Sequence, residues 1–173
     1  FYMFDGCTSL TAAPSLPATT LASLCYCGMF YGCTSLTAAP SLPATTLAST
    51  CYSFMFSGCK SLTAAPSLPA TTLADYCYNS MFQDCTSLTA APSLPATTLA
   101  SSCYNTMFYG CKKIKVSSVS SGTYTKAYRI PKAGAGTMAT RALRNMFSNT
   151  GGTFKGTPEI NTTYYLDESN TIV

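Results

Sequence analysis

Ser9-Leu10-Thr11-Ala12-Ala13-Pro14-Ser15-Leu16-Pro17-Ala18-Thr19-Thr20-Leu21-Ala22 is the stretch that decides the fold, because the same string recurs unchanged from Ser35, Ser61 and Ser87. The residues between the copies keep the same 26-residue step. They comprise a Met-Phe pair starting at Met3, Met29, Met55, Met81 and Met107, and cysteines at Cys7, Cys33, Cys59, Cys85 and Cys111 and at Cys25, Cys51, Cys77 and Cys103. Self-similarity at a fixed period is the signature of a repeat architecture. The sequence therefore predicts a solenoid whose turns stack on their neighbours.

The second half of each repeat predicts a short helix. In one copy it runs from Leu47 to Phe56, with Thr45 or Thr46 as the N-cap and Gly58 as the stop. At 100° per residue, one half of the helical wheel holds the apolar side chains Leu47, Ala48, Cys51, Tyr52, Met55 and Phe56. Positions 49, 50, 53, 54 and 57 differ between copies. We therefore expect the variation to lie on the solvent side of a helix.

The first half of each repeat predicts a short strand. The segment from Ser35 to Pro40 is short and alternating, and it ends at a proline, which suits pairing with its equivalents in neighbouring turns. A period of two places Leu36 and Ala38 inward and Ser35, Thr37 and Ala39 outward. The predicted fold class is α/β: a solenoid with one short parallel strand and one short helix per 26-residue turn, closed by a C-terminal cap.

These residues resemble a known family of repeats. The Cys-x-x-Leu from Cys33 to Leu36, the Pro-x-Leu-Pro that follows, and the Met-Phe before the next cysteine are similar to the BspA-like leucine-rich repeats of bacterial surface proteins. The resemblance covers residues 1–111, with Ala-Pro and Met-Phe in place of the family's common Ile-Pro and Ala-Phe. It implies a leucine-rich-repeat solenoid that attaches to host matrix proteins, other cells or glycans.

The tail, residues 112–173, is predicted to be a divergent last repeat with insertions and a C-terminal cap on the same solenoid. Residues 137–147 align with residues 46–56, and both cysteine positions are lost. A Ser- and Thr-rich insertion lies between Val116 and Arg129 and predicts an extra hairpin. The tail holds nine Lys and Arg residues against three acids, whereas the repeats are nearly neutral. Terminal repeats are expected to be atypical and polar.

Composition limits the chemistry. Only 9% of residues are charged, and there is no His and no Trp. Neither a nucleophile–base pair nor an acid–base pair can be assembled, so we expect no enzyme activity, no cofactor and no metal site. The basic tail lacks a nucleic-acid-binding motif, which leaves a solvated cap as the simpler interpretation.

The cysteines and the chain start carry further expectations. Ten cysteines favour two ladders of buried thiols over a disulfide framework, with Cys27 off-pattern as an exposed thiol. The most apolar stretch, residues 21–33, is too short and interrupted to span a bilayer, so we expect no direct membrane insertion. The chain opens mid-pattern at Phe1, which indicates a fragment or a processed form.

Two main functions fit this architecture. The first is a non-catalytic adhesion or ligand-binding scaffold on the outer cell surface or outside the cell, engaging an extracellular protein or polysaccharide, as part of a larger surface assembly. Its predicted footprint is the outward strand face: Ser9, Thr11, Ser35, Thr37, Ser61, Thr63, Ser87 and Thr89. The alternative is a structural spacer or fibre segment of a surface or phage-tail assembly, favoured by the identical cores. Ice binding by the regular threonine rows is a remote third idea.

Overall fold

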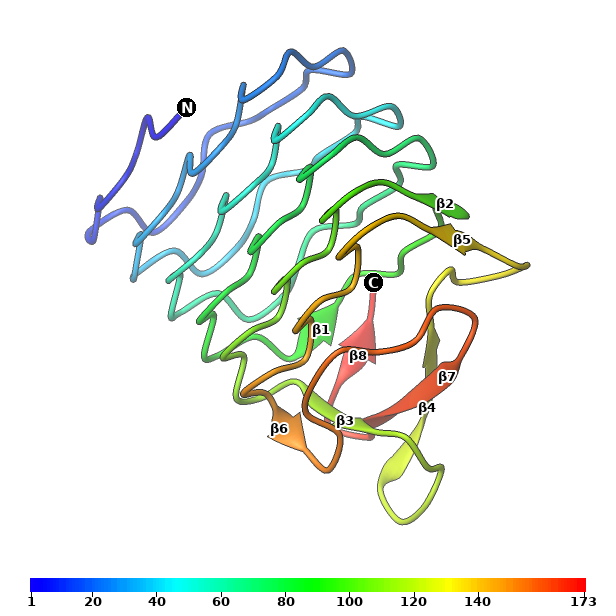
Figure 1. Cartoon of the computed structure of the whole chain (residues 1–173). Coiled ribbons are helices and arrows are strands. Elements are labelled where there is room, and N and C mark those ends of the chain that lie inside the picture. The colour runs from blue at the N-terminus through cyan, green and yellow to red at the C-terminus, as the bar shows by residue number, and fades with distance from the viewer.

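The chain winds into a stack of turns, one 26-residue repeat per turn, followed by a small sheet at the C-terminal end (Figure 1). The computed structural model describes all residues, Phe1–Val173. It contains no helix, and its regular structure consists of short strands. These are β1 (Ala90–Ala91), β2 (Thr98–Leu99), β3 (Lys115–Ser117), β4 (Tyr124–Arg129), β5 (Thr137–Met138), β6 (Gly151–Gly152), β7 (Thr163–Asp167) and β8 (Thr171–Ile172).

The predicted helix is wrong, and with it the α/β class. Residues 47–59 and their equivalents, here called the turn segment, form consecutive four-residue turns. Every fourth residue has a positive φ, as at Thr50 (59°), Phe54 (55°) and Gly58 (77°). An α-helix cannot contain such residues, because all its φ values are negative.

Hydrogen bonding explains why the turn segment is not a helix. Alternate N–H groups close a turn within the repeat, as Met55 N–H does by donating to the Tyr52 carbonyl at 3.2 Å. The intervening N–H groups donate to the next repeat, as Phe56 N–H does to the Met81 carbonyl at 2.9 Å. A helix would use all these groups internally. Here half of them join one turn of the solenoid to the next.

The strand side of each turn is paired more sparsely. Parallel bridges join Ala12 to Ala38, Ala38 to Ala64 and Ala64 to Ala90. Ala38 and Ala64 are exposed whereas Ala65 and Ala91 are buried, so the expected inward position of Ala38 is wrong. The inward–outward alternation of side chains differs from the expected one because Leu36 is still part of a turn, with its N–H donating to the Cys33 carbonyl at 3.1 Å. The extended backbone begins only after Leu36.

Aromatic rings form two columns through the core. The first holds Phe4, Phe30, Phe56, Phe82, Phe108 and Phe147, with ring centroids 5.5–5.8 Å apart and planes within 7° of parallel. The second holds Tyr26, Tyr52, Tyr78 and Tyr104 at 5.8 Å. Each such contact contributes about 0.5–1.5 kcal/mol beyond the apolar area it buries. These columns set the register between turns.

The positions that vary between repeats are not all on the solvent side. Ser53, Ser57 and Asn79 are buried, because the same position of the neighbouring turn covers each of them. Asn105 Nδ2 donates to Asn79 Oδ1 at 2.8 Å, and Asn79 Nδ2 donates to Ser53 Oγ at 3.3 Å. Stacking therefore buries a polar column on the outside of the turn segment, which an isolated helical wheel cannot reveal.

The cysteines are all free thiols, and seven of the nine on-pattern positions are buried. One column donates thiol hydrogen bonds to the previous turn, for example Cys59 Sγ to the Phe30 carbonyl at 3.1 Å and Cys85 Sγ to the Phe56 carbonyl at 3.0 Å. Cys7 is exposed and Cys25 half-buried, because both lie in the terminal turns of the stack. Cys27 is buried, so its predicted exposure is wrong: it occupies the same stacked position as Ser53.

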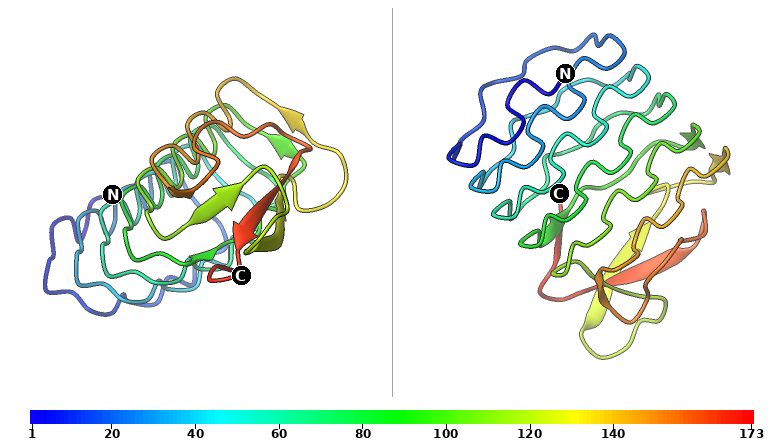
Figure 2. Two further views of the ribbon diagram at one scale, coloured as in Figure 1. Left: turned by 90° about the horizontal axis from the view of Figure 1, so that it is seen from below. Right: turned by 60° about the vertical axis from the view of Figure 1, so that its left-hand side comes forward.

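The cap begins where the last regular turn ends. β3, β4, β6 and β7 form one sheet in the order β4-β7-β3-β6. The predicted hairpin within residues 116–129 is wrong, because β7 lies between β3 and β4 and pairs antiparallel with both. Segments far apart in sequence thus lie side by side at this end of the stack (Figure 2).

Two strands from the tail continue the stack itself. β5 pairs parallel with β2, with Thr137 opposite Thr98, so residues 137–147 occupy the rung after residues 98–108. β8 pairs parallel with β1, with Thr171 opposite Ala90, and so follows the column of alanine bridges. The last edge is also covered: Phe147 N–H donates to the Gly156 carbonyl at 2.9 Å and Asn145 N–H to Thr157 Oγ1 at 2.8 Å. No helix in the structure has the length and apolarity to cross a membrane.

Candidate binding face

The predicted threonines lie at the same position of successive turns. Thr11, Thr37 and Thr63 are exposed, next to the exposed alanines Ala38 and Ala64. The turns hold them in register, because Thr37 N–H donates to the Thr11 carbonyl at 3.4 Å and Thr89 N–H to the Thr63 carbonyl at 2.9 Å. The structure therefore brings these three side chains together into one row, here called the threonine row.

The backbone orients one hydroxyl of this row, that of Thr37, and the equivalent hydroxyl of Thr89 one turn beyond the row. Thr37 Oγ1 donates to the Thr11 carbonyl at 3.3 Å, and Thr89 Oγ1 donates to the Thr63 carbonyl at 3.2 Å. A hydroxyl that has donated its proton keeps two acceptor lone pairs. The Thr37 hydroxyl therefore offers an oxygen acceptor, held in a fixed direction, to the donor of a partner.

The predicted serines contribute less. Ser9 is exposed, but Ser35, Ser61 and Ser87 are half-buried. They sit in the turn that follows each buried cysteine, where Ser61 N–H donates to the Thr34 carbonyl at 3.2 Å. The expectation that period-two alternation places Ser35 beside Thr37 on an open face therefore holds only in part.

Thr89 differs from the other threonines because the tail covers it. It is half-buried, and its carbonyl accepts from Thr171 N–H at 3.1 Å. The open part of the threonine row therefore ends at Thr63.

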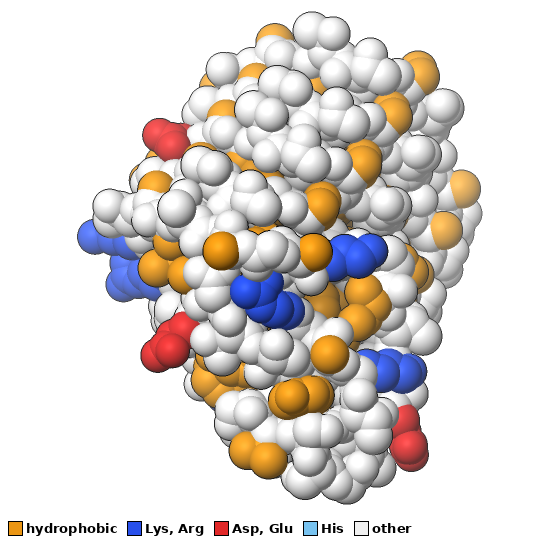
Figure 3. All heavy atoms as spheres, turned by 90° about the vertical axis from the view of Figure 1, so that its right-hand side faces the viewer, with side chains coloured by type: hydrophobic (Ala, Val, Ile, Leu, Met, Phe, Trp, Pro, Cys, Tyr) orange, Lys and Arg blue, Asp and Glu red, His pale blue; other side chains and the backbone are white.

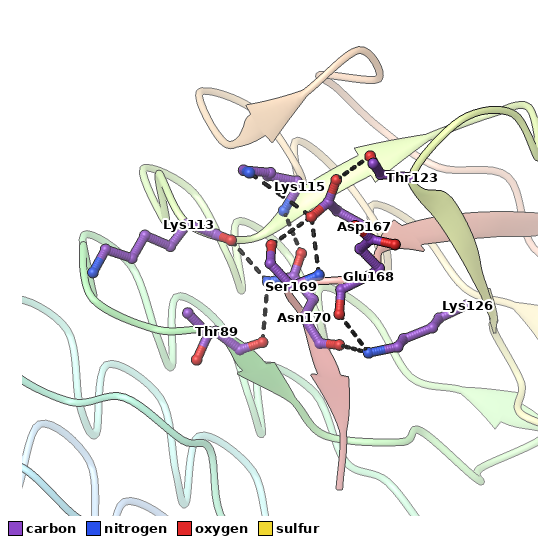
Figure 4. Close-up of polar contacts among 9 residues, drawn as sticks. All are labelled: Thr89, Lys113, Lys115, Thr123, Lys126, Asp167, Glu168, Ser169 and Asn170. Carbon is purple, nitrogen blue, oxygen red and sulfur yellow. Dashed lines mark hydrogen bonds and ion pairs between the residues drawn. The ribbon is translucent and has the colours of Figure 1, made fainter.

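A buried asparagine, Asn170, forms hydrogen bonds to the backbone at this end of the row (Figure 4). In two of the regular repeats, at Thr37 and Thr89, the threonine N–H donates directly to the carbonyl of the equivalent threonine one turn earlier. Lys115 stands one repeat length after Thr89. Asn170 enters between the two: its Nδ2 donates to the Thr89 carbonyl at 3.1 Å, and its Oδ1 accepts from Lys115 N–H at 2.9 Å. Nδ2 also donates to the Lys113 carbonyl at 2.8 Å. A side-chain amide thus replaces a direct bond between turns.

Asp167 supports the same junction. Its carboxylate accepts hydrogen bonds from Ser169 Oγ, Thr123 Oγ1 and Ser169 N–H, and Lys115 Nζ lies 3.8 Å from Oδ1. The Ser169 hydroxyl, followed by that of Thr123, holds the pKa of the Asp167 carboxyl well below its usual range. All its partners belong to the cap, so this carboxylate has a structural role.

Sequence reasoning missed a second exposed row. Thr46 pairs with Thr72 in a parallel bridge, and β2 continues that column at Thr98. The pair at Thr45 and Thr46 is therefore not an N-cap. The exposed members are Thr19, Thr20, Thr45, Thr46, Thr71, Thr72, Thr97 and Thr98. The repeated Thr-Thr pair was a signal of this row, but the helix prediction assigned that pair to an N-cap.

Charge is segregated along the stack. Lys and Arg side chains gather on the cap side of the face in Figure 3, whereas its upper part, formed by repeats, shows none. The only ion pair joins Lys115 and Asp167. No group of three Cys, Asp or Glu side chains has the arrangement of a metal site.

The chain matches no family model, and no curated protein or solved structure is detectably similar to it.

Proposed function

We propose that the protein is a non-catalytic adhesion or ligand-binding scaffold, acting at the cell surface or outside the cell on a protein or polysaccharide. The observation that supports it is the threonine row: Thr11, Thr37 and Thr63 are exposed and lie at the same position of successive turns. Repeated acceptors at one spacing match a partner that is itself repetitive, such as a polysaccharide. The resemblance of residues 1–111 to BspA-like repeats favours the same role.

The test is a screen of the whole chain against immobilised glycans and extracellular matrix proteins. Changing Thr37→Lys and Thr63→Lys together should reduce binding at least tenfold, because two long cations then cover the row while the backbone pairing is retained. The matched control is Ser23→Lys with Ser49→Lys, which adds the same charge at exposed positions of the turn segment. Equal losses from both double variants would remove the threonine row from the proposal.

A structural spacer or fibre segment is the second candidate. It is favoured by the nearly constant ring spacing of 5.5–5.8 Å through successive turns, since a stiff element needs equal turns more than a distinctive surface. A chain that binds no target in the screen would support the spacer over the scaffold.

A further inference from the structure

One pocket opens where the repeats meet the cap. Its volume is about 220 Å³. The lining comes from three parts of the chain: Ser93 of the repeats, Ile172 of β8, and a cap wall formed by Ala127, Tyr128, Arg129, Lys132 and Thr163. It is smaller than the roughly 300–1,000 Å³ of pockets that hold drug-sized ligands. A single sugar residue or one acidic group is of suitable size.

The two cations of this pocket have no acidic partner. Arg129 donates from one Nη to the Pro131 carbonyl at 2.9 Å and from the other to Asn161 Oδ1 at 3.4 Å. Both acceptors are neutral oxygens, so they position the guanidinium without neutralising its charge. Lys132 is exposed and its side chain makes no hydrogen bond, while its N–H donates to the Leu94 carbonyl at 2.9 Å. Both positions are thus fixed by the fold, and both charges are available. Together they favour an oxyanion.

The rest of the lining is neutral and mixed. Ser93 and Thr163 provide hydroxyls. The Ser93 N–H already donates to the Val173 carbonyl at 2.7 Å. Tyr128 forms a rigid apolar wall, because its hydroxyl is buried and donates to the Pro92 carbonyl at 2.8 Å. Cations beside hydroxyls and apolar surface suit a ring that bears both a carboxylate and hydroxyl groups.

We infer that the pocket between β8 and β4 binds a carboxylate-bearing sugar residue of an acidic polysaccharide, with Arg129 and Lys132 holding the carboxylate. This site is separate from the threonine row, and it lies on the tail, where nine cations outnumber three acids. The tail therefore attracts the acidic chain, and the pocket holds one of its residues.

The test is calorimetric titration of the whole chain with a galacturonic acid dimer, with the neutral galactose dimer and a diglutamate peptide as comparison probes. Millimolar or tighter binding of the acidic sugar is expected, with at least tenfold weaker binding of the neutral sugar and of the peptide. Equal binding of the peptide would overturn the assignment to a sugar. No binding of the acidic dimer at millimolar concentrations would overturn the site.

Variants separate the pocket from general charge attraction. Lys132→Gln should weaken binding about tenfold, and Lys155→Gln, an equal loss of charge at an exposed position outside the pocket, should leave it unchanged. Ala127→Glu, which places a carboxylate at the exposed mouth, should abolish binding without touching the core. Equal effects of Lys132→Gln and Lys155→Gln would overturn the pocket. The Thr37→Lys and Thr63→Lys double variant should bind the dimer normally, so this inference and the proposed function fail independently.

Discussion

At the scale of single residues, this protein tolerates an unusual number of left-handed backbone positions. Thirteen residues other than glycine have a positive φ, among them Thr50, Asp84 and Asn145. The left-handed conformation costs an L-residue about 1–2 kcal/mol, less for Asn, Asp or Gly. Repeats that place Gly at these positions avoid the cost, and repeats that place Thr or Phe there offset it by stacking.

Thr50→Asn tests this cost. Thr50 is β-branched at a φ of 59°, and asparagine adopts that region more readily, so the free energy of unfolding should rise by about 1 kcal/mol. Urea unfolding followed by circular dichroism measures it. Thr45→Asn, at an exposed position without a positive φ, is the control and should show no gain; a gain of equal size there would contradict the explanation.

The tyrosine column contains one defect. The Tyr52 hydroxyl is buried without a hydrogen-bond partner, whereas that of Tyr128 donates to the Pro92 carbonyl. Tyr52→Phe should therefore stabilise the protein by about 1 kcal/mol, since an unpaired buried hydroxyl costs about 1–3 kcal/mol. Tyr128→Phe should instead destabilise it, because it leaves a buried carbonyl unpaired. Thermal unfolding of the two variants should shift in opposite directions.

At the scale of elements, the cap strand β8 holds the end of the stack through Asn170. This side chain is fully buried and satisfies two carbonyls and one N–H group of the last turns. β8 pairs with β1 over only two positions, so the junction depends more on the Asn170 side chain than on strand pairing.

Asn170→Ala should lower the free energy of unfolding by about 3 kcal/mol, because three hydrogen bonds of roughly 0.5–1.5 kcal/mol each are lost. Hydrogen exchange should also speed up at the amides of Lys115 and Ser93, which pair with Asn170 and with Val173. Glu168→Ala, an exposed neighbour, is the control. Unchanged exchange at both amides would show that β8 does not need Asn170.

The turn segment shows why its secondary structure escaped prediction. The buried residues of this segment are spaced by four: Leu47, Cys51, Met55 and Cys59. Over a few turns, this spacing is close enough to the 100° per residue of a helix to place them on one side of a helical wheel. The distinction between a period of four and one of 3.6 needs a longer run. Positive φ values at Thr50 and Phe54 leave no local sequence signal, because neither residue favours them; contacts between turns impose them.

At the scale of the whole molecule, the stacked thiols couple folding to pH. Burial raises the pKa of Cys51, Cys59 and Cys103 from 9.0 to about 12 in each case. In the unfolded chain these thiols lose their protons from pH 9 upward, whereas in the folded chain they keep them until about pH 12. The folded state then holds more protons, so stability falls as the pH rises across this window.

We expect the free energy of unfolding to be constant from pH 6 to 8 and to fall steeply above pH 9, by up to about 1.4 kcal/mol per pH unit for each such thiol. Urea unfolding at a series of pH values measures the slope. Cys59→Ala should make the slope shallower, whereas Cys7→Ala, at an exposed position, should not change it. A Cys59→Ala slope equal to that of the unmodified chain would contradict a role for the buried thiols.

By itself, the sequence determined that the chain repeats at one constant period, that the apolar side chains of each repeat face one core, and that the threonines at positions 11, 37 and 63 form a regular set. Those features follow from the repeat period, which can be read from the linear sequence without knowledge of the fold. Only the tertiary structure decided that the turn segment is not a helix, that Cys27 and Asn79 are buried, and that the tail covers Thr89, so that the open threonine row ends at Thr63. It also decided where the basic pocket lies. In each case the deciding bonds and contacts join residues in different turns of the stack, so no local window of sequence contains them.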